Sequence, residues 1–556
     1  MNSTSIASTC SNCNSDFPVT ESDQEFYKTM KVPAPTWCAD CRYQRRLAWR
    51  NERVLYSRKC DGTGEQMLSV YSEDKPFPVY NNDYWYSDKW DALDYGRDYD
   101  FTRPFFEQFE ELTNMVPQLA RSVVKNDNCD YVNQCGMSKD CYLIFEADHD
   151  RNCYYSNNIF DSRDCMEILH GTNNELCYEC VDCHDSYDLK CSQDSKNCSE
   201  SWFLKNCIGC MNCFGSVNLR NKQYYFLNQK YSKEEYEQKV KAVNLASYAG
   251  LQNMRAQFAE LANKFPQKYI HGIKNEDSTG DYISHTERCY NCFDLHNSQD
   301  CRNVNIARNM KMVHDVLAFG SKPGVEFSYE VHETGAGTRN ILFSDQIWGT
   351  CHDISYSKLC VTGSKYLFGC VGLRRAEYCI LNKQYSKEEY EEMLPRIIRH
   401  MESTQEWGQF FPMNIAPYGY NETMAQDYFP MSKEDVLAKG LKWKDKDQRD
   451  YQPAEMEVPD AVSDVPDTIT NALLACTDCA KNYRIIGQEL RFCRGRGVPL
   501  SKKCPDCRHY DRLKLRNPQH LHDRECAKCQ TPLKTSYAPD RPEAIHCESC
   551  YEGMVD

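Results

Sequence analysis

The sequence predicts a mainly β protein with two Cys-rich β-solenoid-like repeat modules and short capping helices, flanked by small zinc-ribbon or treble-clef domains. Three observations predict this fold. Closely spaced cysteine pairs lie near both ends, a long central stretch occurs twice, and a shorter phrase ending in Cys recurs every 12 residues within the centre. At 556 residues the chain is too long for one hydrophobic core, so we expect about three to five folding units.

The two ends of the chain are copies of one module. A four-cysteine set, in which two C-x2-C pairs are separated by 24 residues, recurs at an offset of 466 residues. The match continues past the cysteines, because Arg42 and Asn51 correspond to Arg508 and Asn517. The two sets are Cys10, Cys13, Cys38 and Cys41, and Cys476, Cys479, Cys504 and Cys507.

A third set near the C-terminus has two C-x2-C pairs separated by 17 residues: Cys526, Cys529, Cys547 and Cys550. Zn²⁺ prefers four tetrahedral thiolate or imidazole ligands, and one C-x2-C pair supplies two of them from a tight turn. The twelve cysteines therefore predict three structural Zn²⁺ sites. Iron in a rubredoxin-like site is the alternative for the third set.

The second duplication lies in the centre, where residues 214–237 match residues 368–391 at an offset of 154. Internal repeats take precedence over local patterns when a fold is predicted. Both copies end in Y-S-K-E-E-Y, in which Ser232 and Ser386 are each followed three residues later by Glu, the pattern of a capping box. We expect a helix to close each repeat module.

Within the first repeat, phrases ending at Cys141, Cys153, Cys165 and Cys177 are spaced by 12 residues. Asn or Asp before the Cys suits a tight turn, and the intervening segments resemble short strands with a side-chain period of 2. Stacked coils would place these cysteines in a ladder about 4.8 Å apart, facing inward as small buried fillers. We expect such coils over residues 129–225 and 283–380. Two C-x2-C-x2-C clusters, at 177–183 and 207–213, leave an iron–sulfur cluster or a further zinc site as alternatives.

Three other pieces join these modules. An aromatic and acidic stretch leads through Pro104 into a short amphipathic helix, residues 231–265 have a helical pattern, and residues 445–467 form an acidic, proline-containing linker. The predicted organisation is a zinc ribbon at 1–60, a docking segment at 61–128, solenoid modules with closing helices at 129–240 and 283–400, a helical connector at 241–282, an extension and linker at 401–470, a second zinc ribbon at 471–517 and a four-Cys ribbon at 518–556.

The end modules resemble a known family. The pattern C-x2-C-x3-F-x-V-T followed by V-P-x-P-x-x-C-x2-C-R is similar to the probable zinc-ribbon, treble-clef-like domain of uncharacterised bacterial proteins. The C-terminal copy departs from it at Tyr483, Gly487, Cys493 and Ser501. The whole arrangement is similar to an uncharacterised bacterial family, a resemblance that implies no activity. The residues that carry the motif are Cys10, Cys13, Phe17, Thr20, Phe26, Tyr27, Pro33, Pro35, Cys38, Cys41 and Arg42.

Basic residues follow the last knuckle of both copies. If that knuckle starts a helix, Arg42, Arg46 and Arg50 form one stripe, and Arg508, Arg512 and Arg516 form its twin. Arginine stripes beside aromatic residues such as Trp37 and Trp49 are typical of RNA binding. In the alternative interpretation the stripes are solvated helix faces or pair with the chain's own acidic segments, residues 83–111 in particular.

The composition limits the function classes. The net charge is −15 and no apolar run approaches the length of a membrane span, so we expect a cytoplasmic protein without a membrane partner. The preferred function is a non-enzymatic zinc-binding protein that binds RNA or a ribonucleoprotein through its basic ribbons. A scaffold for protein partners is the first alternative. An enzyme with a groove lined by the evenly spaced His296, His314 and His332 is the second.

Overall fold

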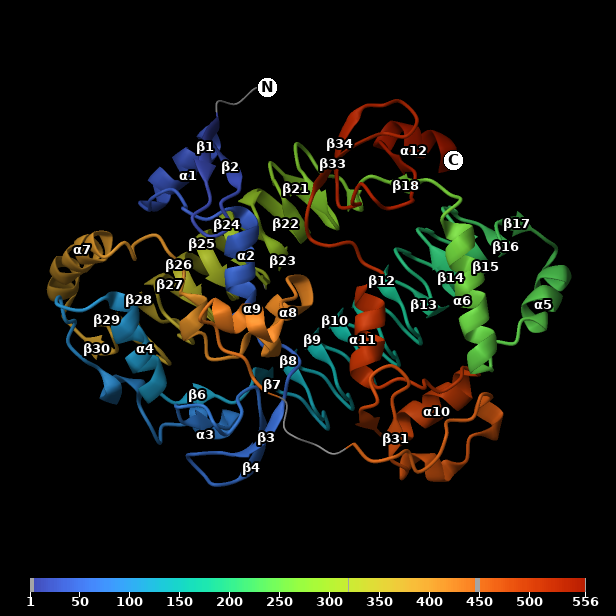
Figure 1. The fold of residues 1–556 in the computed structure, drawn as a ribbon, viewed down its shortest axis with the longest axis horizontal. Helices are drawn as coiled ribbons and strands as arrows, with labels where there is room; N and C mark the ends of the chain where they lie inside the picture. Colours follow the sequence, from blue (N-terminus) through green and yellow to red (C-terminus); the bar gives the residue numbers. More distant parts are fainter. Residues whose placement is uncertain (1–4, 319, 446–450, 556) are drawn as a thin grey trace. The chain divides into compact units, whose positions relative to one another are not determined.

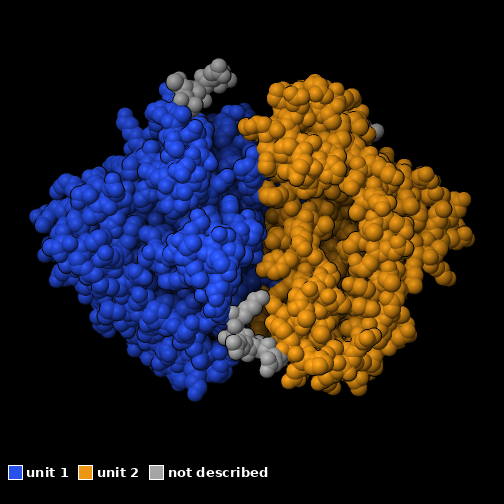
Figure 2. Space-filling model, viewed as in Figure 1, with its two compact units in different colours: residues 1–121, 270–445, 519–521 blue, residues 122–269, 446–518, 522–556 orange. Residues whose placement is uncertain are grey.

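The computed structural model describes residues 5–318, 320–445 and 451–555. The chain divides into two compact units (Figure 2). Unit 1 comprises residues 1–121, 270–445 and 519–521, and unit 2 comprises residues 122–269, 446–518 and 522–556. The units are interleaved along the sequence, so the N-terminal ribbon belongs with the second repeat module, and the C-terminal ribbons belong with the first.

The first repeat module is a β-solenoid in unit 2 (Figure 1). Its strands pair in parallel, Asn157 with Leu169 and Leu169 with Val181, so the length of one coil equals the spacing of the predicted phrases. The final pair of strands is antiparallel. The strands are β7 (Val123–Val124), β8 (Asn133–Gly136), β9 (Phe145–Asp148), β10 (Asn157–Phe160), β11 (Leu169–Thr172), β12 (Val181–His184), β13 (Tyr187–Lys190), β14 (Ser199–Lys205), β15 (Met211–Val217), β16 (Gln223–Phe226) and β17 (Gln229–Lys230).

The backbone of the coils repeats every three residues, so the predicted side-chain period of 2 is wrong. Every third residue is left-handed, and the residue after it points inward. Examples at equivalent positions of three successive coils are Asp140, Asn152 and Asp164, with φ of 55°, 52° and 51°. A left-handed residue changes the direction of the chain, so side chains no longer alternate between the two faces as they do along an extended strand. Asn and Asp tolerate this conformation best among residues with a Cβ, which explains why they precede the cysteines.

The interior of the coils is narrow, because four inward side chains per coil meet on its axis. In one coil these are Cys153, Ser156, Ile159 and Ser162, all buried. The Sγ of Cys153 bonds two carbonyl oxygens, those of Arg151 and Ser162. Outside, Asn–Asp ladders link successive coils, as where Asn152 Nδ2 donates to Asp164 Oδ1 at 2.8 Å. The prediction that Cys141, Cys153, Cys165 and Cys177 face inward is confirmed, and small buried thiols explain much of the cysteine content.

The second repeat module, in unit 1, is less regular. Met310 pairs with Val325, and Val325 pairs with Thr338, so these coils are longer than those of the first module. The strands are β19 (Gly272–Ile273), β20 (Gly280–Asp281), β21 (Ile283–Glu287), β22 (Cys292–Arg302), β23 (Asn305–Arg308), β24 (Met310–Leu317), β25 (Val325–His332), β26 (Thr338–Asp345), β27 (His352–Ser355), β28 (Lys365–Phe368), β29 (Glu377–Ile380) and β30 (Lys383–Gln384).

Both predicted capping boxes are present. Helix α5 (Lys233–Ala242) starts at Ser232, whose side chain accepts from Glu235 N, and α7 (Lys387–Ser403) starts at Ser386 in the same way. The predicted helix after Pro104 is α4 (Phe105–Met115), and the predicted connector contains α6 (Tyr248–Ala262). The extension adds η2 (Met413–Ile415), η3 (Tyr420–Glu422), α8 (Met424–Tyr428) and α9 (Lys433–Ala438), and the linker adds η4 (Val462–Asp464) and η5 (Asp467–Thr470). Residues 446–450 of the predicted linker lie outside the described residues.

The cysteine sets lie in small modules of hairpins and short helices. The N-terminal ribbon has β1 (Ser5–Thr9), β2 (Asp16–Thr20), α1 (Glu21–Met30) and α2 (Ala39–Leu47), followed by β3 (Tyr56–Lys59), β4 (Gln66–Ser69), β5 (Val79–Tyr80), α3 (Asn82–Trp85), η1 (Ala92–Tyr95) and β6 (Gln118–Leu119). The C-terminal part has β31 (Leu474–Ala475), β32 (Asn482–Tyr483), α10 (Gly487–Arg496), α11 (Pro505–Leu513), β33 (His522–Glu525), β34 (Pro532–Thr535), β35 (Ile545–His546) and α12 (Glu548–Val555), and β35 pairs with β18 (Gln267–Lys268). No helix among the described residues is long and apolar enough to cross a membrane.

Candidate metal centres and docked arginine helices

The twelve predicted metal ligands form three groups of four cysteines. In each group the four Sγ atoms lie within 4.8 Å of one another. The Sγ–Sγ distances are 3.7 Å for Cys13–Cys38, 3.6 Å for Cys479–Cys504 and 3.7 Å for Cys529–Cys547. A tetrahedral site with Zn–S bonds of about 2.3 Å has S–S edges of about 3.8 Å, so each group fits one zinc ion.

Tight turns and helix starts position the cysteines of these groups. In the first knuckle Cys10 N donates to Ser15 O and Asn14 N donates to Cys10 O, with Asn14 left-handed at φ 61°. The second pair starts a helix, because Cys38 is the N-cap of α2 and Cys504 the N-cap of α11. Burial raises the pKa of the Cys476 thiol, but the backbone N–H groups of Cys504, Asp478 and Cys479 outweigh it and lower the pKa to about 7. The turn at Cys476 therefore favours the thiolate of that residue, the form that binds metal.

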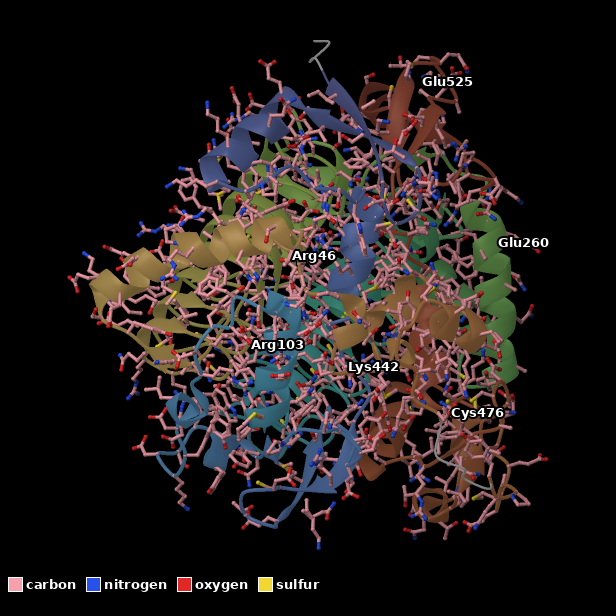
Figure 3. All side chains as sticks on the ribbon, turned by 60° about the vertical axis from the view of Figure 1, so that its left-hand side comes forward. Arg46, Arg103, Glu260, Lys442, Cys476 and Glu525 are labelled. Atoms are coloured by element: carbon pink, nitrogen blue, oxygen red, sulfur yellow. The ribbon has the colours of Figure 1, made fainter. Side chains whose placement is uncertain are left out.

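Helix α2 continues from the first cysteine group into the solenoid of unit 1, beside β24 and β25 (Figure 1). Its arginines are buried, and Arg46, labelled in Figure 3, is fully inaccessible to solvent. Arg42 Nη2 lies 2.8 Å from Asp315 Oδ2, and Arg46 contacts both Asp315 and Glu330 at 3.4 Å. Arg45 Nη2 reaches Glu330 Oε1 at 2.8 Å. Burial raises the pKa of Asp315, but Arg42 and Arg46 outweigh it and hold the pKa below its usual range.

The network extends through Arg50. Its Nη1 lies 2.7 Å from Glu333 Oε1 and 3.4 Å from His332 Nε2. His332 Nδ1 is 2.5 Å from Asp345 Oδ1, and Asp345 Oδ2 is 2.7 Å from Lys358 Nζ. Burial raises the pKa of Asp345, but Lys358 and His332 outweigh it and hold the pKa below its usual range. The cations Arg42, Arg45, Arg46, Arg50 and Lys358 balance the carboxylates Glu52, Asp315, Glu330, Glu333 and Asp345.

Unit 2 repeats this docking with α11, which lies beside β11. Arg508 Nη1 contacts Glu167 Oε1 at 2.5 Å and Glu489 Oε1 at 2.8 Å, and Arg512 also pairs with Glu167. Arg516 Nε lies 2.8 Å from Asp182 Oδ2, while its Nη1 lies 3.2 Å from His170 Nε2. The last arginine of each stripe thus contacts both a solenoid carboxylate and a solenoid histidine.

The six predicted RNA-contacting arginines are therefore buried, each with a relative exposure of 7% or less. They pair mainly with carboxylates of the solenoids rather than with the acidic segment 83–111 named as the alternative. An exposed arginine stripe is not what the structure shows. RNA binding by the chain stays a prediction, and in this fold these six guanidinium groups do not face solvent to carry it.

Sequence reasoning missed the carboxylates that receive the arginines. Glu167, Glu330 and Glu333 are all left-handed, with φ of 63°, 49° and 57°. Asn and Asp are favoured at such positions, so Glu there is unusual. Glu146, Glu179 and Glu200 share this conformation, and Glu179 pairs with Arg255 of α6, so a left-handed Glu alone does not identify a carboxylate that receives the arginine stripes.

The three histidines of the evenly spaced series lie in different environments. His296 Nδ1 bonds Ser284 Oγ at 2.8 Å. His314 is buried and its ring stacks on Phe26 of α1 at 3.6 Å, and His332 belongs to the ion-pair network described above. The convergence that would favour an enzyme is not what the structure shows for these three rings.

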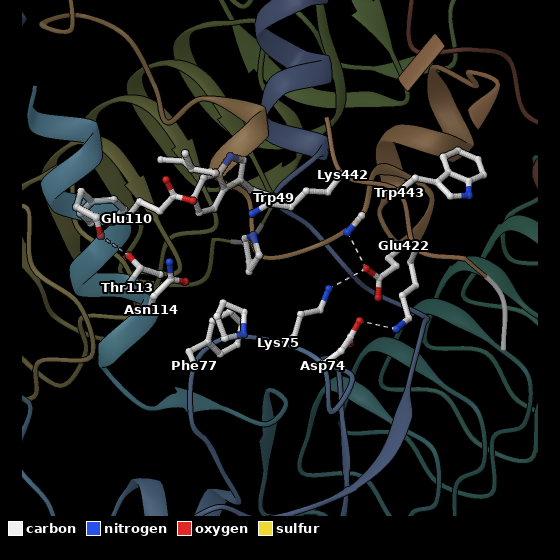
Figure 4. A pocket seen from close by; sticks show the side chains of 16 residues that line it. Trp49, Asp74, Lys75, Phe77, Glu110, Thr113, Asn114, Glu422, Lys442 and Trp443 are labelled. Atoms are coloured by element: carbon white, nitrogen blue, oxygen red, sulfur yellow. Dashed lines mark hydrogen bonds and ion pairs between the residues drawn. The ribbon is translucent and has the colours of Figure 1, made fainter. Parts of the chain in front are cut away.

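Unit 1 also has a cavity of about 410 Å³ (Figure 4). Its walls include Trp49, Phe77 and Phe109, and most of its charges are paired: Lys75 with Glu422 at 3.1 Å and Lys444 with Asp74 at 2.8 Å. Lys442 Nζ donates to Ala416 O at 2.9 Å, and desolvation lowers its pKa. The cavity is thus lined by both aromatic rings and ion pairs.

Comparison with known proteins identifies one part of the chain. Residues 6–49 match the family model of the probable treble clef domain, so the N-terminal ribbon belongs to that family. The match covers the first cysteine group and α2, and it confirms the resemblance inferred from the motif. No curated protein matches the chain. A UDP-N-acetylglucosamine acyltransferase from Campylobacter jejuni is 9% identical over 51% of this chain and 90% of that chain, with a TM-score of 0.08, which is too low to carry an argument.

Proposed function

We propose that this chain is a zinc-dependent scaffold for protein partners, in which three Zn²⁺ ions have a structural role. The observation that supports the proposal most directly is the continuity of ligand and docking helix. Cys38 and Cys41 lie at the start of α2, Arg42 and Arg46 follow on the same helix, and Arg50 lies just after its end. All three pair with carboxylates of the solenoid. A metal at this group would fix the orientation of the arginine stripe.

The chemistry of the groups supports zinc in that role. Four cysteines complete a tetrahedral shell and leave no position for water or substrate, which is typical of structural rather than catalytic zinc. Zinc in such a site supplies folding free energy to a module too small to be stable through its own core.

Burial of the arginines favours a protein partner over RNA. Phosphate recognition needs accessible cations, and both stripes are used internally by ion pairs with the solenoids. The enzyme alternative loses its main support because His296, His314 and His332 are used in three separate contacts.

The test combines metal content with nucleic-acid binding. Elemental analysis of the purified full chain should give three zinc ions per chain. Fluorescence anisotropy with single-stranded RNA at low salt should show no salt-sensitive binding. Abundant iron would contradict the metal assignment, and RNA binding that weakens steeply with salt would contradict the choice of partner.

A further inference from the structure

The duplication of the chain ends extends beyond the first ribbon. At the same offset of 466 residues, Cys60 corresponds to Cys526, Tyr71 to Tyr537 and Pro76 to Pro542. Residues 56–85 therefore align with the third four-cysteine group. The sequence pattern predicts an aromatic docking segment over most of this region.

The secondary structure of the two segments agrees element by element. The hairpin β3–β4 pairs Tyr56 with Ser69, and β33–β34 pairs His522 with Thr535, which are the corresponding residues. Strand β5 then pairs in parallel with β6, as β35 does with β18. In both cases the partner strand contains the Gln of a Pro-Gln pair, at Gln118 and at Gln267.

The turn at Cys60 has the hydrogen bonds of a metal-binding knuckle. Cys60 N donates to Glu65 O at 2.9 Å, and Gly64 N donates to Cys60 O at 2.8 Å. The corresponding bonds at Cys526 are both 2.9 Å. Asn81 N lies 3.3 Å from Cys60 Sγ, and Cys547 N lies at the same distance from Cys526 Sγ.

The other three ligand positions have changed. Thr63, Asn81 and Tyr84 stand where the metal-binding copy has Cys529, Cys547 and Cys550.

Two of these residues make bonds or contacts of their own. Asn81 Oδ1 accepts from Tyr84 N at 2.8 Å and caps α3. The Tyr84 ring covers Gly62, where an added Cβ would lie 2.5 Å from Tyr84 Cε1. In the metal-binding copy Lys528 stands at the position of Gly62, and Cys550 at the position of Tyr84. The replacement of the fourth ligand by a tyrosine ring is therefore accompanied by loss of the side chain that the ring would strike.

We infer that residues 56–85 are a fourth zinc-ribbon module that folds without metal and keeps a latent four-ligand site at positions 60, 63, 81 and 84. A single thiol cannot hold zinc, and the tyrosine ring and the asparagine cap replace the metal in joining the hairpin to the helix. The inference goes beyond the proposed function, because it makes this module of unit 1 independent of metal. The loop between β4 and β5 contributes Asp74, Lys75, Pro76 and Phe77 to the cavity wall. The part of the wall that this loop forms is therefore also independent of metal.

The test restores the missing ligands in the full chain. The variant T63C/N81C/Y84C, purified with zinc, should contain one more zinc ion per chain than the parent. The matched control adds Cys60→Ser and should return to the parent's metal content. A folded triple variant whose metal content equals that of the parent would overturn the inference.

A second measurement uses the parent protein and does not depend on whether the variant folds. After treatment with a chelator, hydrogen exchange should remain slow in residues 56–85 and become fast in residues 522–555. Simultaneous loss of protection in both segments would also overturn the inference. Both readouts compare a module with its own copy, so they stand whether or not the partner of the chain is a protein.

Discussion

The docked helices α2 and α11 perform the same task with different partners. Each starts at a cysteine group, and the three arginines of its stripe, two on the helix and one just after its end, are buried against a solenoid. In unit 2 the ribbon supplies one of the carboxylates itself, since Glu489 of α10 pairs with Arg508. Its counterpart in unit 1, Asp23 of α1, pairs instead with Arg302 of the solenoid at 2.7 Å. The arginine stripe is common to both copies, whereas the carboxylates that receive it differ.

The environments of the two helices differ as well. In unit 1 the extension covers α2, with Tyr43 and Leu47 packed among Tyr420, Met424 and Val436. In unit 2 Tyr510 and Leu515, on or just after α11, are exposed. The comparison teaches that the internal arginine contacts are shared by both docked helices. The extension covers α2 in unit 1, whereas on α11 His509, the counterpart of Tyr43, is buried and Tyr510 is exposed.

Loss of one metal ligand should have the largest effect. Cys38→Ser should unfold the N-terminal ribbon and release α2, and Cys504→Ser should do the same to the second ribbon and α11, because metal binding contributes on the order of 10 kcal/mol to such modules. Elemental analysis should show one metal ion fewer per chain in each variant. Hydrogen exchange should speed up in the ribbon and docking helix that contain the substitution and stay unchanged in the other unit. Unfolding of both units by either change would contradict the comparison.

Removing a docking carboxylate should rank second. Glu330→Gln removes the charged partner of Arg45 and weakens the pairing of Arg46. Glu167→Gln removes a carboxylate that pairs with both Arg508 and Arg512. Each change should lower the free energy of unfolding of its unit by about 3–5 kcal/mol. Denaturant titration measures this loss. The matched controls are Glu326→Gln and Glu175→Gln, on or near the same solenoids but at more exposed positions, where the change should stay below about 1 kcal/mol. Equal losses in variant and control would show that the buried pairs do not hold the helices.

Acid should weaken unit 1 through His314. Burial, with a smaller contribution from Arg302, lowers the pKa of this ring from 6.5 to about 3. The contribution of His314 to the free energy of unfolding is fully present above pH 6.5. It declines by up to about 1.4 kcal/mol per pH unit as the pH falls toward 3, because the unfolded chain takes up the proton first. His314→Phe keeps the stack on Phe26 and should flatten the pH dependence of unfolding. In unit 2 the residue that corresponds to Phe26 is Phe492, which packs against Tyr178, so the same pH change should have a smaller effect there.

The smallest effect should come from the helix caps, because a Ser at the N-cap makes the same hydrogen bond in both units. Ser232→Ala and Ser386→Ala each remove the side chain that accepts from the N3 backbone N–H of α5 or α7. Each should lower the free energy of unfolding by about 1 kcal/mol, as measured by thermal denaturation. Replacement by Gly should cost less than replacement by Ala. A large difference between the two units would mean that these helices do more than cap the solenoids.

The sequence by itself determined the features that depend on local spacing. Paired cysteines identified three four-ligand groups, the duplications identified the solenoids, and Ser232 with Glu235 identified the start of α5. These features could be predicted because a knuckle, a short coil and a capping box each need only residues close together in the chain. The predicted side-chain period of the coils was wrong, because the hydropathy of a sequence does not reveal a left-handed residue at every third position.

Only the tertiary structure decided which solenoid receives each ribbon and which way the arginines face. Arg42 meets Asp315, and Arg512 meets Glu167, although the two members of each pair come from distant parts of the sequence. A charged stripe on a helix has the same pattern whether it faces water or a carboxylate, because the pattern records the helix and not its neighbour. The burial of a guanidinium depends on a balancing charge, and that charge comes from a distant part of the chain.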